Sequence, residues 1–161
     1  MSWWTVLKYF VLGIFVSAEW IEEQRRTHGM RSLARNSGLN FLGKLSLPGA
    51  LCLYGTPFQA VNGLKTSNLI DGTLRGLHVV VFDCRVMEKE EWQRTVIAAR
   101  TTPDVFTSPA HHPELQLIHI GGWSVLFYPK GSAATHGNGL MSIEEVEEHL
   151  GSIANEATRI G

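Results

Sequence analysis

The chain has 161 residues, of which 44% are hydrophobic and 18% are charged, and its formal net charge is −1. This composition is typical of one globular domain and excludes a disordered or low-complexity chain. It also excludes the domain-wide basic charge of many nucleic-acid-binding proteins, so we expect no nucleic-acid partner. Two cysteines, Cys52 and Cys84, are too few for a disulfide framework, and we expect both to be buried thiols.

The first 21 residues are the most apolar part of the chain, with a hydrophobic run from Val6 to Ala18. A helix needs about 20 apolar residues to cross a bilayer, and this segment just reaches that length. Tryptophans at both ends are typical of membrane interfaces, and a lysine near one end can extend its side chain to the lipid headgroups. The residues that we expect to contact the lipid bilayer are Trp3, Trp4, Lys8 and Trp20.

Arginines follow this segment directly, at positions 25, 26, 31 and 35. Positive charge collects on the cytoplasmic side of membranes. We therefore predict a single-pass transmembrane or signal-anchor helix at residues 1–21 and a single cytoplasmic domain at residues 22–161. Two alternatives remain open. Val16-Ser17-Ala18 fits a signal-peptide cleavage site, and a soluble protein could carry the segment as an ordinary helix.

Helical and irregular segments come next. Residues 19–37 are predicted to be a helix with its charged residues 22–26 exposed to solvent. Ser37-Gly38 is a typical helix end. Residues 41–58 contain five glycines and prolines, which predicts a loop.

Strand signals begin near residue 62. The strongest is Leu77–Val86, where an unbroken apolar centre predicts burial on both faces, and Trp92–Arg100 should pair with it as a hairpin. Asp71-Gly72 is predicted to be a turn. The remaining strand candidates are Ser67–Ile70, Glu114–Ile120 and Trp123–Tyr128.

The C-terminal helix is predicted from a capping box. Ser142 and Glu145 stand three residues apart, so each side chain can bond the other's backbone amide. Apolar residues then recur at helical spacing. The sequence thus predicts an α+β fold: an N-terminal membrane helix, then a small antiparallel sheet of four or five strands packed with two helices on one face.

Seven histidines raise the question of a metal site. No two of them have the spacing that places two ligands on one face of a strand or helix. His111 and His112 are adjacent in a loop and are the weak candidates for metal ligands. We predict no bound metal and no cofactor.

Asp83 and Cys84 end the strongest strand. With His119 they are candidates for nucleophilic or general-base catalysis. The alternative is structural, with Asp83 capping a turn or forming a cross-strand ion pair, and its possible partners are Arg85, Arg94 and Arg100. No nucleotide-binding glycine motif and no serine-hydrolase motif are present.

Two segments carry a resemblance to known proteins. Residues 68–72 read Asn-Leu-Ile-Asp-Gly, and residues 76–84 read Gly-Leu-His-Val-Val-Val-Phe-Asp-Cys. With the helix end between Ala34 and Phe41, they resemble a family of uncharacterised bacterial single-pass membrane-anchored proteins over residues 30–128. The resemblance implies this strand pair and a membrane location. It implies no chemistry, because the family has no established activity, and Cys84 stands where an aromatic residue is more usual.

Three functions remain open from the sequence. The favoured one is a non-catalytic binding or interaction domain, anchored on the cytoplasmic face of a membrane, whose partner is a protein or a small molecule. The second is a small hydrolase or metal-dependent enzyme that uses Asp83 and Cys84 with His111, His112 or His119. The third is a secreted or periplasmic domain, released by cleavage at Ala18, in which Cys52 and Cys84 could form a disulfide.

Overall fold

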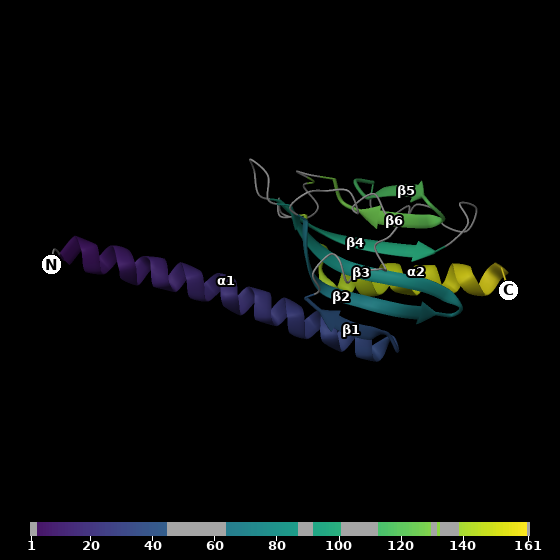
Figure 1. Ribbon diagram of the computed structural model, residues 1–161, viewed down its shortest axis with the longest axis horizontal. Helices are drawn as coiled ribbons and strands as arrows, with labels where there is room; N and C mark the ends of the chain where they lie inside the picture. Colours follow the sequence, from purple (N-terminus) through teal and green to yellow (C-terminus); the bar gives the residue numbers. More distant parts are fainter. Residues whose placement is uncertain are drawn as a thin grey trace.

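A computed structural model describes residues 3–44, 64–86, 92–100, 113–129, 132 and 139–160. The described part of the chain forms an antiparallel sheet with two helices, which confirms the α+β class (Figure 1). In chain order the elements are α1 (Trp3–Asn36), β1 (Asn40–Gly43), β2 (Leu64–Leu74), β3 (Leu77–Val86), β4 (Trp92–Arg100), β5 (Gln116–Ile120), β6 (Trp123–Phe127) and α2 (Ile143–Ile160).

The sheet has six strands in the order β1-β2-β3-β4-β6-β5, and all neighbours are antiparallel. The predicted hairpin of β3 and β4 is confirmed, with Phe82 opposite Val96. The sheet contains one strand more than predicted, because β1 lies where the sequence predicts the start of a loop. Phe41 of β1 pairs with Ile70 of β2, a partner 29 residues further along the chain (70 − 41).

The predicted turn at Asp71-Gly72 is wrong, because both residues lie inside β2. Gly72 is needed there for close packing, since a Cβ atom on it would lie 2.8 Å from Cδ2 of Leu39. The β2–β3 turn is formed instead by Arg75 and Gly76, with φ angles of 48° and 85°. Two positive φ angles in a two-residue loop match the twist of the strands that it joins.

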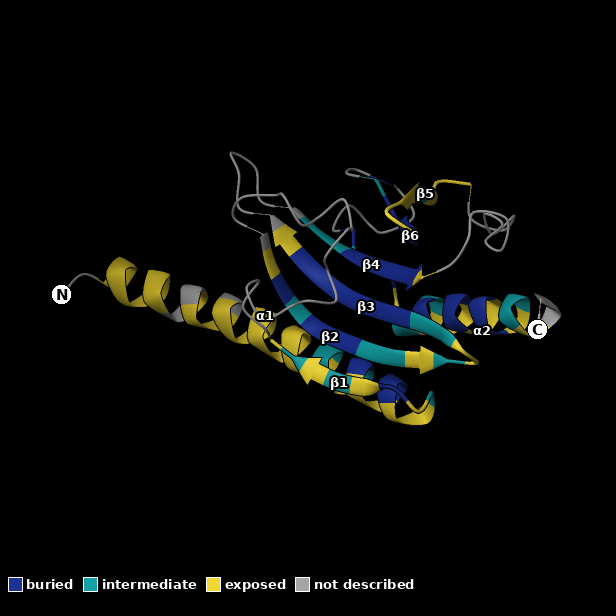
Figure 2. Ribbon diagram, turned by 45° about the vertical axis from the view of Figure 1, so that its right-hand side comes forward, coloured by how far each residue is buried: buried dark blue, intermediate teal, exposed yellow. Residues whose placement is uncertain are grey.

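Both faces of the central strands are buried (Figure 2). Val79 and Val81 of β3 pack with α1 and α2 in the larger hydrophobic core, whereas Val80 and Phe82 belong to a second apolar cluster. Successive side chains of a strand point to opposite faces, so the two clusters lie on opposite sides of the sheet. This arrangement explains the unbroken apolar run of β3. Both helices contribute to the same core, as predicted.

The two predicted helix signals are confirmed. α1 ends at Asn36, Gly38 follows with a φ of 70°, and the amide of Leu39 donates to the carbonyl of Ala34 at 2.8 Å. These are features of a Schellman motif. At the start of α2, the Glu145 amide donates to Oγ of Ser142 at 3.1 Å, and the Ser142 amide donates to the Glu145 carboxylate at 2.7 Å.

α1 is a single long helix with two different environments. Its C-terminal part packs into the core through Met30, Leu33 and Ala34, while its N-terminal part projects away from the sheet (Figure 1). Among the described residues, no helix is long and apolar enough to cross a membrane. The prediction of a membrane-spanning helix at residues 1–21 is therefore not supported. Lys8 and Glu19 interrupt the apolar stretch.

Candidate functional site

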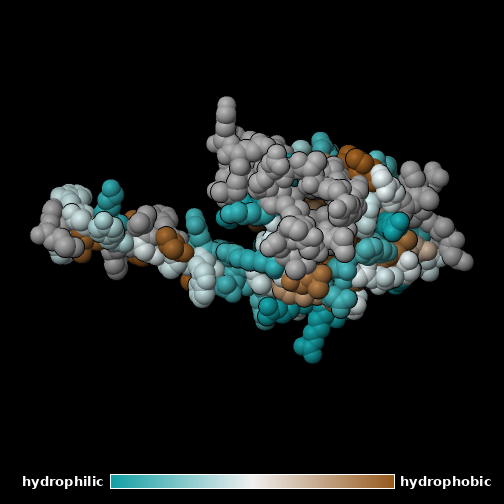
Figure 3. Space-filling view, viewed as in Figure 1, coloured by the Kyte–Doolittle hydropathy of each residue, from teal (hydrophilic) through white to brown (hydrophobic). Residues whose placement is uncertain are grey.

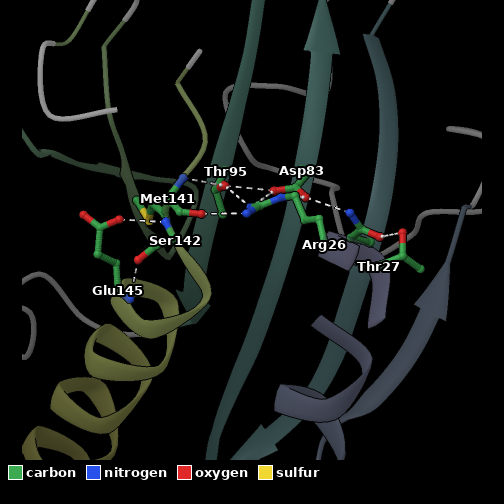
Figure 4. A network of polar contacts seen from close by, with 8 residues as sticks. Arg26, Thr27, Asp83, Thr95, Met141, Ser142 and Glu145 are labelled. Atoms are coloured by element: carbon green, nitrogen blue, oxygen red, sulfur yellow. Dashed lines mark hydrogen bonds and ion pairs between the residues drawn. The ribbon is translucent and has the colours of Figure 1, made fainter. Parts of the chain in front are cut away.

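A buried polar network joins α1 to the middle of the sheet (Figure 4). At its centre is the carboxylate of Asp83 on β3, a residue that is only 5% exposed. Arg26 of α1 forms a two-point ion pair with it: Nε donates to Oδ2 and Nη2 donates to Oδ1, both at 2.6 Å. Side-by-side bonds of this kind are among the strongest side-chain hydrogen bonds, and they fix the orientation of both groups.

Two further donors complete the environment of the carboxylate. Nδ2 of Asn68 donates to Oδ2 at 2.8 Å, and Oγ1 of Thr95 donates to Oδ1 at 2.8 Å. Each oxygen of Asp83 thus accepts two hydrogen bonds, which is the acceptor capacity of an ionised carboxylate. A buried charge requires such complete pairing, because its removal from water is otherwise very costly.

The hydroxyl of Thr95 is also fully used. While it donates to Asp83, it accepts from Nη2 of Arg26 at 2.7 Å and from the amide of Met141 at 3.0 Å. A hydroxyl has one proton and two lone pairs, so all three of its hydrogen-bonding sites are occupied. Thr95 therefore ties β4 both to α1 and to the segment that precedes α2.

Arg26 reaches that segment directly as well, since its Nη1 donates to the carbonyl oxygen of Met141 at 2.7 Å. The next residue of α1 extends the network to β2: Oγ1 of Thr27 donates to Oδ1 of Asn68 at 2.9 Å. One turn of α1 is thus connected to three strands and to the start of α2. The network consists of Arg26, Thr27, Asn68, Asp83, Thr95 and Met141.

Asn68 reaches Asp83 because of a bulge in β2. The strand register shifts between Ser67 and Ile70, and Asn68 has a φ of 53°. Asparagine adopts this left-handed conformation more readily than most residues with a side chain. The bulge therefore directs the carboxamide of Asn68 toward the helix-covered face, where Asp83 lies.

The network leaves Asp83 without the free lone pair that a general base or nucleophile needs. Cys84 follows it on the strand and faces the opposite side of the sheet, in the second apolar cluster. Burial raises the pKa of the Cys84 thiol to about 12. A thiol with so high a pKa is a poor nucleophile at neutral pH, because the thiolate is the reactive form. Cys84 is also a free thiol.

The structure separates the predicted catalytic residues. His119 lies on β5, where Nδ1 contacts Oγ of Ser124 at 2.8 Å. β5 is three strand positions from β3, and the strand register places His119 level with Val79, so at about 4.8 Å per strand His119 lies more than about 14 Å from Asp83. His111 and His112 lie outside the described residues. No group of three metal-ligating side chains occurs in the ranges that the structure describes.

The sequence prediction for the ion pair of Asp83 is wrong, since its partner is Arg26 and not Arg85, Arg94 or Arg100. Arg94 instead stacks over the ring of Phe127, with 4.9 Å between the guanidinium carbon and the ring centre. The prediction that Arg26 is exposed with the rest of residues 22–26 is also wrong, because its side chain is 17% exposed. The signal for its burial is its spacing: it precedes Met30 by four residues and Leu33 by seven, which places all three on one helix face.

No protein-family model matches the chain, and comparison with curated proteins and with solved structures gave no match. A function for this protein must therefore be inferred from its own residues.

Proposed function

We propose that this chain is a membrane-anchored protein whose α+β domain is a non-catalytic binding domain on the cytoplasmic face. The observation that carries the proposal is the exposure of the N-terminal part of α1. Of the twelve large hydrophobic side chains that are exposed in the described part of the chain, ten lie between Trp3 and Ile21. The space-filling view has hydrophobic surface along this projecting segment (Figure 3).

The apolar side chains occur on more than one face of the helix. At 100° per residue, Leu7 and Ile14 lie on one face of the helix and Tyr9 lies on the opposite face, and their exposed fractions are 42%, 52% and 66%. A helix that packs on a domain has one apolar stripe, whereas a helix that is apolar all round requires apolar surroundings on every side. A contiguous exposed surface of this size on a single chain marks a site of membrane or protein contact.

The ends of the exposed segment fit the boundary of a bilayer. Trp3 and Trp4 lie at one end and Trp20 at the other, as in the aromatic belts of membrane proteins. The exposed arginines Arg25, Arg31 and Arg35 follow, and they favour the cytoplasmic side for the domain.

The partner of the domain is proposed to be a protein or a small molecule rather than a substrate. Asp83, the most buried acidic candidate, is saturated by hydrogen bonds, and Cys84 is a buried neutral thiol on the other face. These observations support a binding role for the domain.

Fractionation of cells that express the full-length chain tests the proposal. We expect the chain to sediment with membranes, to resist a high-salt wash and to be released by detergent. Ile14→Lys places a charge in the middle of the apolar segment and should move most of the protein into the soluble fraction. Glu22→Lys is the matched control, because it adds a lysine at an exposed position beyond that segment.

Recovery of the unmodified chain in the soluble fraction without detergent would refute the anchoring. Release by high salt alone would also contradict it, since the binding would then be electrostatic and not apolar. A binding partner that is chemically converted during incubation with the chain would contradict the non-catalytic role.

A further inference from the structure

We propose that a displacement of α1 changes the cap at the first turn of α2. Two contacts transmit the displacement, and both lie where α1 leaves the domain. The first contact is polar: Nη1 of Arg26 donates to the carbonyl oxygen of Met141 at 2.7 Å. The second is steric. A Cβ atom on Gly29 would lie 2.9 Å from Cγ1 of Ile143, so the α1 backbone lies directly against the first residue of α2. Arg26 and Gly29 are three residues apart on one helix face.

The contacts continue into α2 through its cap. Met141 is followed by Ser142, which forms the capping box with Glu145 (Figure 4). The Glu145 carboxylate also accepts a hydrogen bond from the hydroxyl of Tyr128 at 3.1 Å. A shift of Met141 therefore moves Ser142, its neighbour in the chain. The other residue of the cap, Glu145, stays bonded to Tyr128, which follows β6.

The network has a stationary side and a movable side. Asp83 is paired on both sides, with Ser67 of β2 and Thr95 of β4, and the amide of Thr95 donates on its other side to the carbonyl oxygen of Gly139 at 3.1 Å. Arg26 lies on a helix that extends beyond the domain by 20 residues (residues 3–22), which is about 30 Å at 1.5 Å per residue. A change in the direction of this projecting arm therefore acts first on the exposed ion pair of Glu23 with Lys44, and then on the contacts of Arg26 and Gly29.

The response at Arg26 is expected to be a switch between two arrangements. A displacement that breaks part of the ion pair leaves buried charge uncompensated, so intermediate positions are disfavoured. Coupling between distant sites requires such a connected element with two discrete arrangements. Since the bilayer is what would orient the arm, the inference rests on the proposed membrane anchoring.

Hydrogen exchange on the full-length chain tests the inference, with the protein in phosphatidylcholine vesicles and in detergent micelles. A bilayer constrains the angle between α1 and the domain, whereas a micelle does not. The amides of Glu145 and Val146 report on the cap, because both bond to Ser142. We expect their exchange rates to differ between vesicles and micelles by about fivefold or more, the lower end of typical coupling between sites.

Two variants should abolish this difference. Arg26→Lys keeps the charge but loses the planar fork that binds Asp83 and Met141 together. Gly29→Ala separates α1 from Ile143 by adding a methyl group. Arg25→Lys is the matched control, because Arg25 is a neighbouring, 75% exposed arginine, and it should behave as the unmodified chain. Amides of β3 report whether each variant is folded.

The outcomes separate the two proposals. If the unmodified chain does not float with vesicles, the anchoring is refuted and the inference with it. If it floats but Glu145 and Val146 exchange equally in vesicles and micelles, only the inference is refuted, and this comparison needs no variant. A difference that persists in folded Arg26→Lys and Gly29→Ala chains would also refute it.

Discussion

Asp83 accepts four hydrogen bonds from Arg26, Asn68 and Thr95, so its charge is compensated although it is almost completely buried. A carboxylate in this state holds elements together and has no lone pair for a substrate. Its identity as an acid matters nonetheless. A buried ion pair is stabilising only while both partners are present, because removal of one leaves the other charge buried and unpaired.

A double-mutant cycle on Arg26 and Asp83 follows from this argument. We expect Arg26→Ala and Asp83→Ala each to lower the free energy of unfolding by about 3–5 kcal/mol. The double variant should lose less than the sum by about 1–3 kcal/mol, because neither charge is left alone. Urea unfolding in a mild detergent measures these values. Arg25→Ala, which removes an exposed pair with Glu22, should cost under about 1 kcal/mol. Strictly additive losses would contradict the direct coupling.

The elements of the fold divide into those that local sequence specifies and those that need a distant partner. Ser37-Gly38 and the Ser142–Glu145 box were predictable because the groups that form each motif lie within six residues of one another. β1 was not, since a strand of four residues exists only through its pairing with β2. Asp71-Gly72 has the composition of a turn, but packing against Leu39 overrides that preference.

The candidate site was less predictable than the fold. The sequence marks Asp83 as unusual at the end of an apolar strand, and the resemblance marks Asn68. It does not show that Arg26 is their partner, because 57 residues separate Arg26 from Asp83. Nor does it show the bulge that turns Asn68 toward the carboxylate, since bulges depend on the register of two strands.

Gly139 gives a prediction for the segment before α2. Its φ is 75°, and a Cβ atom there would lie within van der Waals overlap of the carbonyl oxygen of Gln93 on β4. We expect Gly139→Ala to lower the free energy of unfolding by more than about 2 kcal/mol. Gly151→Ala is the control within α2: no atom lies within 4 Å of its added methyl group, so it should raise stability by about 0.5–1 kcal/mol. Equal effects of the two variants in denaturant unfolding would contradict this packing.

Tyr128 gives a prediction for the dependence of stability on pH. Burial, with the hydrogen bond to the Glu145 carboxylate as the next cause, raises the pKa of its phenol to about 12. The folded chain therefore holds this proton more tightly than the unfolded chain, whose tyrosines ionise near about pH 10. The resulting stability is complete below about pH 10 and is lost as the pH rises through about 12. Urea unfolding across this range should show the loss, and Tyr128→Phe should reduce it; the part that remains includes that of Cys84, whose pKa is also raised to about 12.

At the scale of the whole molecule, α1 has two parts: one is packed in the domain core, and the other projects from the domain with exposed apolar side chains. From Met30 onward its apolar side chains are buried in the core, whereas ten large apolar side chains between Trp3 and Ile21 are exposed. Burial of apolar surface is the main stabilising contribution to a domain, so only the first set contributes to its folding. The exposed set is a liability for solubility unless it enters an apolar phase. The Arg26 network lies between the two sets and fixes the direction in which the exposed part leaves the domain.

Substitutions in the two parts of α1 should therefore have opposite effects on stability and on membrane association. Leu7→Gln combined with Ile14→Gln, at positions 42% and 52% exposed, should change the free energy of unfolding in detergent by less than about 0.5 kcal/mol per site. If the proposed anchoring holds, the same pair should sharply reduce flotation with vesicles, because it removes two of the apolar side chains proposed to enter the bilayer. Leu33→Ala, at a position 3% exposed, should lower the unfolding free energy by about 2–5 kcal/mol and leave flotation unchanged at temperatures where the domain is folded. A comparable loss of stability in the Leu7 and Ile14 double variant would mean that the projecting part packs on the domain, and the separation of α1 into two regions would be wrong.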